Sequence, residues 1–367
     1  MISTKSQAGM GLKIGIDISQ IVYQTGVSRY TSELVKHLLK IDQQNQYVLY
    51  AGSLRQRSII QAFAAQLPRK TKLVLTLLSP KLADFAWNRF NLLPPPETDV
   101  FHASNWALPR TKAKLVTTIH DLTFLKYPET HTKYSVAAHT RHLKLAKKYA
   151  DQIIAVSEST KKDLIDYGIQ AEKITVIYEA ADSIFKPVDP RDVKAKYGLT
   201  KPYFLSVGTR EPRKNLQRLI EAFSKLPTRS DLEVTLVIVG PVGWGESLKI
   251  PSNVQFLGFV PDEDLVGLYS GAKAFVYPTL YEGFGLPVLE ALSCGCPVIT
   301  SNVSSLPEVG GEAAIYVNPQ SVAEITQAMA AVRKLNLSGK SLAQAKKFSW
   351  EKTAKETLKV YQEVVQC

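Results

Sequence analysis

Short runs rich in β-branched and aromatic residues alternate with helix-like segments along most of the chain. In the first half we predict strands at 12–18, 47–52, 72–78, 99–103, 114–120, 152–157 and 174–178, with helices between them that include 28–40 and 134–150. This alternation is typical of parallel α/β sheets, because parallel strands need a long crossover connection that is usually a helix.

The same alternation begins again after the proline-bearing stretch IFKPVDPRDVKAKYGLTKP. Strands are predicted at 203–208, 234–240, 253–258, 272–278, 297–301 and 313–317, and the amphipathic segment SWEKTAKETLKVYQEVVQ is predicted to form a last helix. Because 367 residues are too many for one ordinary core, we expect two domains. The predicted fold is α/β, with two doubly wound Rossmann-like domains facing a cleft.

Composition excludes several classes of protein. The chain is 45% hydrophobic and 21% charged, which is globular, and it has no apolar run of the roughly 20 residues that a membrane helix needs. The start, MISTKSQAGMG, lacks the apolar stretch of a signal peptide. Cys294, Cys296 and Cys367 have neither metal-site spacing nor a disulfide framework, so we expect reduced thiols in the cytoplasm.

The positive charge is concentrated in the first half. Residues 1–185 hold 24 Lys and Arg against 15 Asp and Glu, a balance of +9, whereas residues 186–367 hold 21 against 18, a balance of +3. This excess favours an anionic partner, either a lipid surface or a lipid-linked diphosphate, over nucleic acid. A merely solvated basic surface is the alternative, and the sequence sets no oligomeric state.

Ligands of doubly wound sheets bind beyond the carboxyl ends of the strands. By that rule the candidate functional residues are Asp17, His102, His120, Ser157, Gly208 and Glu282. Glu282 opens the stretch EGFGLPVLE, in which seven residues separate it from Glu290. Glycines in this turn allow close approach of the backbone, and the amide groups of Gly283, Phe284, Gly285 and Leu286 would point from a helix N-terminus at a phosphate or a sugar hydroxyl.

Glu290 lies about one turn into the predicted helix. The helix dipole favours its ionised form, which can accept both hydrogens of a ribose diol, while Glu282 reaches another part of the same ligand. A glycine turn with a glutamate that only stabilises the helix end explains the same residues. Composition and spacing leave these two interpretations open.

Several motifs in order resemble one enzyme family. EGFGLPVLEALSCGCPVITS resembles the E-x7-E segment of the retaining glycosyltransferases of family 4, also called group 1. Five further segments resemble other parts of that family: GIDISQIVYQTGVSRYTSELVKHLL, TTIHDLTFLKYPE, ADQIIAVSESTKKDLIDYG, LSVGTREPRKNLQRLIEAF and FSWEKTAKETLKVY. Together they span nearly the whole chain.

The resemblance implies a GT-B fold and a division of labour between domains. After a start that is predicted to be a loose tail over 1–11, it implies an acceptor-binding domain over 12–190, a nucleotide-sugar-binding domain over 191–349, and a closing helix over 350–367 that packs back toward the first domain. It also implies front-face transfer of a hexose with retention, in which the leaving diphosphate helps to deprotonate the acceptor.

The resemblance assigns further site residues. Within GTREPRKN it implies that Lys214 and an arginine hold the diphosphate, and Arg210 and Arg213 both remain candidates because Thr209, not arginine, follows the glycine. It places Gly26 near the donor phosphates and His120 beside the donor sugar, with simple structural roles as the alternative for each. Val260 stands at the edge on which the nucleotide base could stack.

Two further patterns have competing interpretations. Asp262 and Asp264 form a D-x-D motif, but they follow Pro261 and are predicted as the acidic first turn of a helix, not as a metal site. The helix 134–150 is surrounded by Lys133, Arg141, His142, Lys144, Lys147 and Lys148. This basic face indicates either a solvated surface or a peripheral membrane contact.

We therefore predict a cytoplasmic hexosyltransferase, with a peripheral contact to the inner face of the membrane left open. Its donor would be a GDP- or UDP-linked sugar, with mannose suggested by the GTREPRKN segment, and its acceptor a glycan or a lipid-linked glycan. No cofactor and no metal are expected. The alternatives are a nucleotide-sugar epimerase of similar architecture, which needs no acceptor, and a non-catalytic module that binds glycolipid.

Overall fold

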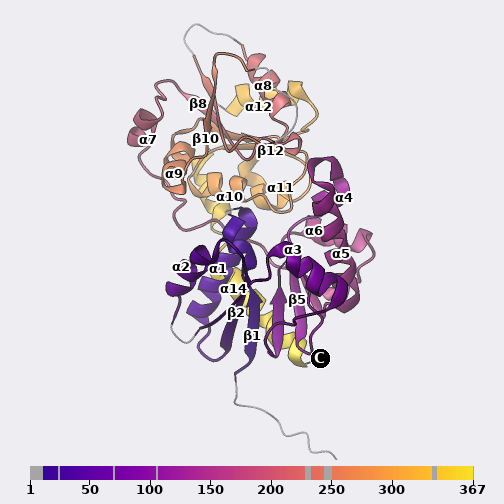
Figure 1. Cartoon of the computed structure of the whole chain (residues 1–367). Coiled ribbons are helices and arrows are strands. Elements are labelled where there is room, and N and C mark those ends of the chain that lie inside the picture. The colour runs from indigo at the N-terminus through magenta and orange to yellow at the C-terminus, as the bar shows by residue number, and fades with distance from the viewer. Residues whose placement is uncertain are drawn as a thin grey trace, which may run out of the picture.

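A computed structural model describes residues 11–23, 25–68, 71–104, 106–227, 233–243, 250–332 and 337–366. Two parallel sheets, one from each half of the chain, lie one above the other with helices around both (Figure 1). Apart from Gly11, the predicted tail over 1–11 lies outside these residues, and so does Cys367.

The first sheet has the strand order β3-β2-β1-β4-β5-β6-β7. Its strands are β1 (Lys13–Asp17), β2 (Gln46–Gly52), β3 (Lys72–Thr76), β4 (Val100–Ala103), β5 (Lys114–Ile119), β6 (Gln152–Ala155) and β7 (Ile174–Val176). The chain reverses its direction of travel across the sheet between β1 and β4. That pair is the switch point at which doubly wound sheets bind their ligands.

The second sheet has the order β10-β9-β8-β11-β12-β13, with its switch point between β8 and β11. Its strands are β8 (Tyr203–Val207), β9 (Thr235–Val239), β10 (Val254–Gly258), β11 (Ala274–Tyr277), β12 (Val298–Ser301) and β13 (Ala314–Val317). Every strand predicted from the sequence is present, and its ends agree with the prediction within two residues.

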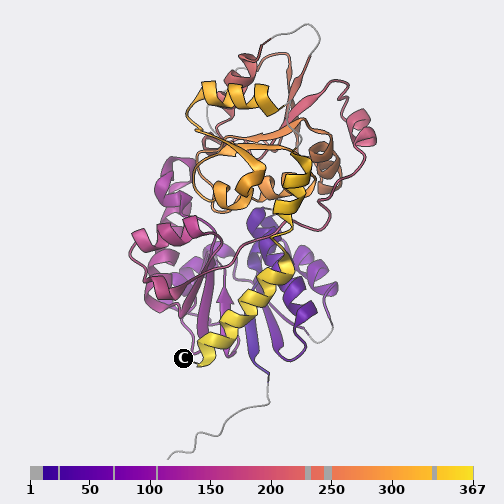
Figure 2. The ribbon, with the colours of Figure 1, turned by 180° about the vertical axis from the view of Figure 1, so that it is seen from behind.

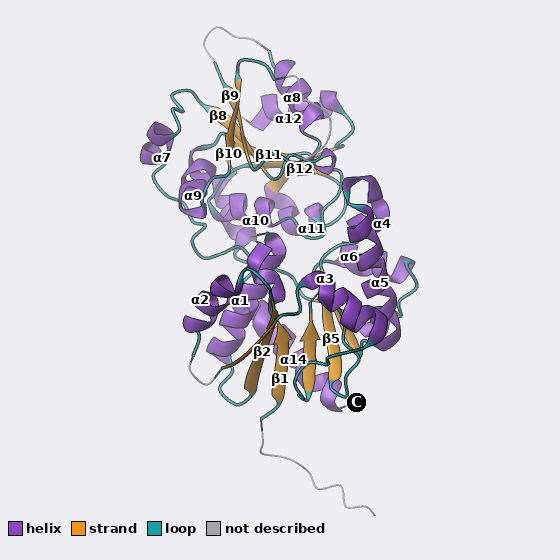
Figure 3. Cartoon of the chain, viewed as in Figure 1, coloured by secondary structure: helices purple, strands orange, loops and turns teal. Residues whose placement is uncertain are grey.

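Helices cover the faces of both sheets (Figure 3). In the first half these are α1 (Gly26–Ile41), α2 (Arg57–Ala65), α3 (Pro80–Ala83), α4 (Thr123–Lys126), α5 (Lys133–Tyr149) and α6 (Glu158–Asp166). The second half contributes α7 (Arg191–Lys196), α8 (Leu216–Ser224), α9 (Asp262–Gly271), α10 (Leu286–Ser293), α11 (Leu306–Gly310), α12 (Val322–Val332), α13 (Ser338–Ala345) and α14 (Trp350–Gln366). Short 3-10 turns occur at Ser19–Tyr23, Pro128–Thr130, Ala171–Lys173, Pro212–Lys214 and Gly311–Ala313, and a π-helical turn at Asp84–Phe90.

The last helix returns to the first sheet. Figure 2 shows α14 crossing that sheet from behind, and its apolar side chains Trp350, Ala354 and Tyr361 are buried in the same core as Ile14 of β1 and Leu34 of α1. Apolar residues of α14 recur three or four positions apart, so one stripe faces the core. None of the helices in the described ranges is long and apolar enough to cross a bilayer.

Candidate active site

Glu282 follows β11, at the switch point of the second sheet, and is nearly buried. Its Oε1 accepts hydrogen bonds from Lys214 Nζ (2.7 Å), Tyr277 Oη (2.8 Å) and Thr279 Oγ1 (3.0 Å). Arg213 Nη1 lies 2.8 Å from the same oxygen. Burial alone would raise the pKa of Glu282, but the positive charges of Arg213 and Lys214 outweigh it and hold the pKa at about 2.

The two cations come from the loop after β8, the other strand of the switch point. Pro212 begins a single 3-10 turn that contains Arg213 and Lys214, and Arg213 Nη1 also donates to the carbonyl of Tyr281 at 2.7 Å. Arg210 points elsewhere, with its guanidinium 4.3 Å from the centre of the Phe256 ring. Arg213, not Arg210, therefore lies beside Lys214 on Glu282. Both cations are almost buried, so their charge acts in a poorly solvated place.

Glu290, in α10, contacts the first half of the chain. Arg29 of α1 donates from Nη1 to Glu290 Oε1 and from Nη2 to Asp262 Oδ2 at 2.6 Å. Glu290 Oε2 accepts from Tyr269 Oη at 3.1 Å. Burial raises the pKa of Glu290 and the charge of Arg29 only partly offsets this, so the ionised form is less favoured than the helix dipole led us to expect.

The glycine turn joins the two halves. A Cβ on Gly283 would lie 1.9 Å from the carbonyl oxygen of His120, so only glycine fits there. The carbonyl of Gly283 accepts from Ser157 Oγ at 2.6 Å and from Thr160 Oγ1 at 3.2 Å. Gly285 has φ of +111°, a conformation that side chains disfavour. The turn therefore brings the carboxyl end of β5 against the start of α10.

His120 directly follows β5, with one ring nitrogen hydrogen-bonded and one without a partner among the described residues. Its Nδ1 lies 2.9 Å from Glu179 Oε1, and since a carboxylate can only accept, His120 donates there. Its buried Nε2 has no hydrogen-bond partner among the residues that the structure describes. This nitrogen is therefore open to a hydrogen bond with a ligand.

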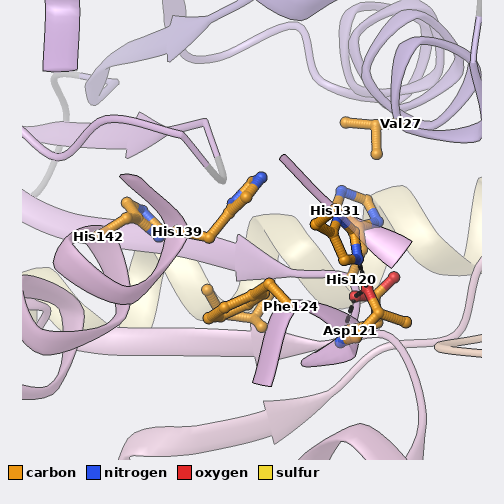
Figure 4. Close-up of a pocket in the computed structure, with 9 residues that line it drawn as sticks. Val27, His120, Asp121, Phe124, His131, His139 and His142 are labelled. Carbon is orange, nitrogen blue, oxygen red and sulfur yellow. Dashed lines mark hydrogen bonds between the residues drawn. The ribbon is translucent and has the colours of Figure 1, made fainter. Parts of the chain in front are cut away.

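An open pocket of about 180 Å³ lies at His120. It is lined by Val27, Ile119, His120, Asp121, Thr123, Phe124, His131, His139 and His142. Figure 4 shows His120, Asp121 and His131 grouped at one end, with His139 and His142 of α5 beyond Phe124. His131 Nε2 lies 3.1 Å from Thr123 Oγ1. The pocket is thus a recess of mixed polar and apolar lining in the first half, beside the turn of the second.

Other predicted residues surround this centre or support it. Gly26 begins α1, and a Cβ on it would lie 3.5 Å from Leu286 Cδ1. The side chains of Phe284, Leu286 and Val260 are buried in one apolar cluster of the second half, so they are not exposed for a base to stack on. His102 is held away from the pocket, bonded to Tyr361 Oη at 2.6 Å and to Thr118 Oγ1 at 2.9 Å.

The D-x-D motif lies in the first turn of α9, as the sequence predicted. Asp262 pairs with Arg29, and Asp264 Oδ2 accepts from Lys196 Nζ and from Tyr197 Oη at 2.7 Å. Within the described ranges no group of three or more His, Cys, Asp and Glu side chains could hold a metal ion.

Three residues of the site were not predicted from the sequence. Arg29 stands three residues after Gly26 in TGVSRY, where an arginine inside a glycine-led helix start was a usable signal. Tyr277 ends β11, so the strand-end rule could have found it. Glu179 follows β7 in an irregular segment, and nothing in its surroundings marks it.

Comparison with known proteins identifies the family. The profile described as "Glycosyltransferase Family 4" matches residues 24–183, and "Glycosyl transferases group 1" matches residues 190–356. The O-antigen chain mannosyltransferase B of Escherichia coli is 34% identical over 92% of this chain and 96% of its own length. The chain belongs to the group 1 glycosyltransferases. Its two domain halves correspond to the two profiles.

Two further relatives extend the comparison. The serotype-specific mannosyltransferase WbdA of Escherichia coli is 36% identical over 56% of this chain, but that match covers only 28% of WbdA. HepE of Anabaena, solved in complex with UDP and glucose, superposes with a TM-score of 0.73 and 17% identity over 96% of this chain and all of its own. The superposition confirms the GT-B fold, and the family membership confirms a hexosyltransferase over the epimerase and the binding module.

Proposed function

We propose that this glycosyltransferase moves mannose from a nucleoside-diphosphate mannose, with GDP as the nucleotide, to a hydroxyl group of a glycan that can be lipid-linked. The mannose assignment is supported by the printed functions of two relatives, both mannosyltransferases. The main observation in support of the site is that Arg213, Lys214 and Glu282 meet at one switch point, next to the pocket at His120.

The nucleotide is proposed to lie along the second sheet. Arg213 and Lys214 would hold the diphosphate through charge-assisted hydrogen bonds, together with the backbone amides between Gly283 and Leu286 at the start of α10. Glu290 would accept from the ribose hydroxyls, exchanging part of its contact with Arg29 for them. Glu282 would turn its second oxygen to the mannose.

The proposed chemistry is front-face substitution. The acceptor oxygen bonds to the anomeric carbon of mannose on the side from which the diphosphate leaves, the bond from that carbon to the diphosphate oxygen breaks, and the diphosphate takes the acceptor proton. The two buried cations stabilise the charge that develops on the leaving group. His120 would position a sugar hydroxyl through its open Nε2. No protein nucleophile is needed.

We further propose that the reaction needs no metal ion and no other cofactor. Arg213 and Lys214 supply positive charge, shared with Glu282 and Glu211, where a metal would otherwise neutralise the diphosphate. Both aspartates of the D-x-D motif already have cationic partners on other elements. The proposed location is the cytoplasm, at the inner face of the membrane, which the basic first half supports.

A donor panel tests the proposal. Purified protein is incubated with GDP-mannose, UDP-glucose or UDP-galactose, each with and without a mannose-terminated acceptor, and nucleotide release is followed together with the sugar product. We expect acceptor-dependent release from GDP-mannose. Turnover of donor without acceptor would favour the epimerase instead, and release from a UDP-sugar alone would overturn the choice of donor.

A further inference from the structure

An apolar ridge stands on the surface of the first half. We give this name to Leu82, Phe85, Phe90, Leu92 and Leu93, whose exposed fractions range from 44% to 64%. The rings of Phe85 and Phe90 lie 4.7 Å apart, so the ridge is continuous at its centre. Single exposed leucines are common on protein surfaces, but contiguous apolar patches mark places where something else binds.

The ridge is a built surface. The opposite face of the turn Asp84–Phe90 is buried and hydrogen-bonded. Asp84 accepts from Arg141 Nη2 at 2.7 Å, and Asn88 Nδ2 donates to the carbonyl of Trp106 at 3.0 Å. The buried Trp87 donates from Nε1 to the carbonyl of Leu93 at 2.9 Å. These bonds fix the outward side chains in place, although burying them would lower the free energy of the isolated protein.

The backbone of Leu93 is also held in an unfavourable conformation. Its φ of +54° lies in the left-handed region, which a branched side chain occupies only at a cost in energy. The carbonyl bond to Trp87 holds this conformation, and 64% of the Leu93 residue stays exposed. Strained residues that the surroundings enforce cluster at functional surfaces.

The charges around the ridge are positive. Lys81 and Arg89 are exposed within it, while the one acidic residue between 77 and 96, Asp84, is buried under Arg141. Arg89 Nε lies 4.0 Å from Asp84, which leaves its exposed guanidinium only loosely paired. Helical periodicity places Lys133, Lys144 and Lys148 on the side of α5 that carries Arg141, and Arg141 itself contacts Asp84 of the ridge segment.

The structure also reduces the number of free positive charges on the basic face that the sequence predicted for α5. Arg141 is neutralised by Asp84, and His142 is buried, which lowers its pKa to about 3 and leaves it uncharged. The membrane contact expected from residues 134–150 therefore cannot rest on these two side chains. The exposed lysines remain, beside the ridge.

We propose that the apolar ridge and its basic rim dock on the surface of an anionic lipid bilayer. A row of apolar side chains with the exposed cations Lys81 and Arg89 among them, and with the acid of the same segment, Asp84, buried, matches the boundary between acyl chains and anionic headgroups. A protein partner would be expected to meet mixed charges at the rim. Docking there would hold the first half, and with it the pocket at His120, close to the membrane surface.

The test measures binding to vesicles, which needs no catalysis and so is independent of the proposed reaction. Full-length protein is sedimented with vesicles of phosphatidylcholine alone or with added phosphatidylglycerol. The variants are Phe85→Ser with Phe90→Ser, and Lys81→Glu with Arg89→Glu. The matched control is Val188→Ser with Ile250→Ser, two exposed apolar residues of the second half. Thermal melting confirms that each variant is folded.

We expect wild type to bind the anionic vesicles and the control to bind equally well. Each basic residue removed from such a surface should lower the partition coefficient about fivefold, and the phenylalanine pair should lower it at least as much. Equal binding of wild type and both ridge variants would overturn the proposal. So would sedimentation equilibrium showing that the ridge mediates self-association in the absence of lipid.

Discussion

Replacing Glu282 with glutamine should destabilise the folded protein through one lost charge. The amide keeps an oxygen for Tyr277 and Thr279, but Arg213 and Lys214 lose the carboxylate that pairs with them in a nearly buried place. Removing one partner of a buried ion pair is costly, because the remaining charges stay desolvated.

The pKa of Glu282 sets the magnitude. It is lowered from 4.5 to about 2 on folding, and about 2.5 pKa units correspond to about 3 kcal/mol of stabilisation at neutral pH. Because the folded-state pKa is the lower one, this stabilisation is present above the unfolded value of 4.5 and is lost as the pH falls through about 2. At a pH of about 3, more than half of it should already be gone.

Urea unfolding of wild type and Glu282→Gln at pH 7 and at a pH of about 3 measures this difference. The matched control is Glu356→Gln, since Glu356 lies 3.9 Å from Lys352 on the surface and should contribute less than about 0.5 kcal/mol. We expect a loss of about 3 kcal/mol for Glu282→Gln at pH 7 that shrinks toward acid. A loss no larger than the control's, or one that does not change with pH, would refute the reasoning.

Three further outcomes are expected. Glu290→Gln should weaken GDP binding, measured by calorimetry, about 10- to 150-fold, because it removes a charge-assisted acceptor. Glu282→Gln should instead lower kcat more than it weakens GDP binding. An unchanged GDP affinity in Glu290→Gln would show that Glu290 has only a structural role. Gly283→Ala should cost at least about 1–3 kcal/mol in unfolding experiments, because its Cβ collides with the carbonyl of His120. Turnover in excess EDTA should stay within about twofold of the untreated rate, since the buried cations already offset the diphosphate charge; a loss that magnesium restores would contradict metal independence.

The fold could be predicted because its signal is local. Each strand is a short apolar run bounded by polar or glycine residues, and the alternation with helices admits only parallel sheets. The strand-end rule also gave Glu282 and His120 as candidates, each at the carboxyl edge of its own sheet, because parallel strands bring their carboxyl ends to one edge. These inferences need no knowledge of how the two halves meet.

The remainder of the site depends on contacts between distant segments. Arg29 and Glu290 are separated by 261 residues and Ser157 and Gly283 by 126, and no local pattern encodes such pairs. Glu290 is an example. Its position in the helix favours ionisation, but burial raises its pKa and the charge of Arg29 offsets this only in part. Likewise nothing in the sequence favours Arg210 or Arg213 as the partner of Lys214. The structure distinguishes them, because Arg210 lies over the Phe256 ring and Arg213 pairs with the Glu282 carboxylate.

Transfer of mannose by the site at Lys214 is the central claim, and product analysis tests it most directly. Protein with 13C-labelled GDP-mannose and a mannose-terminated acceptor is followed by NMR, with Lys214→Met and the surface variant Lys352→Met assayed alongside. The account predicts an α-linked mannoside from wild type and Lys352→Met, because GDP-mannose is α-linked and retention preserves the anomer, and a drop of at least about 100-fold for Lys214→Met. A β-linked product, or full activity in Lys214→Met, would contradict it.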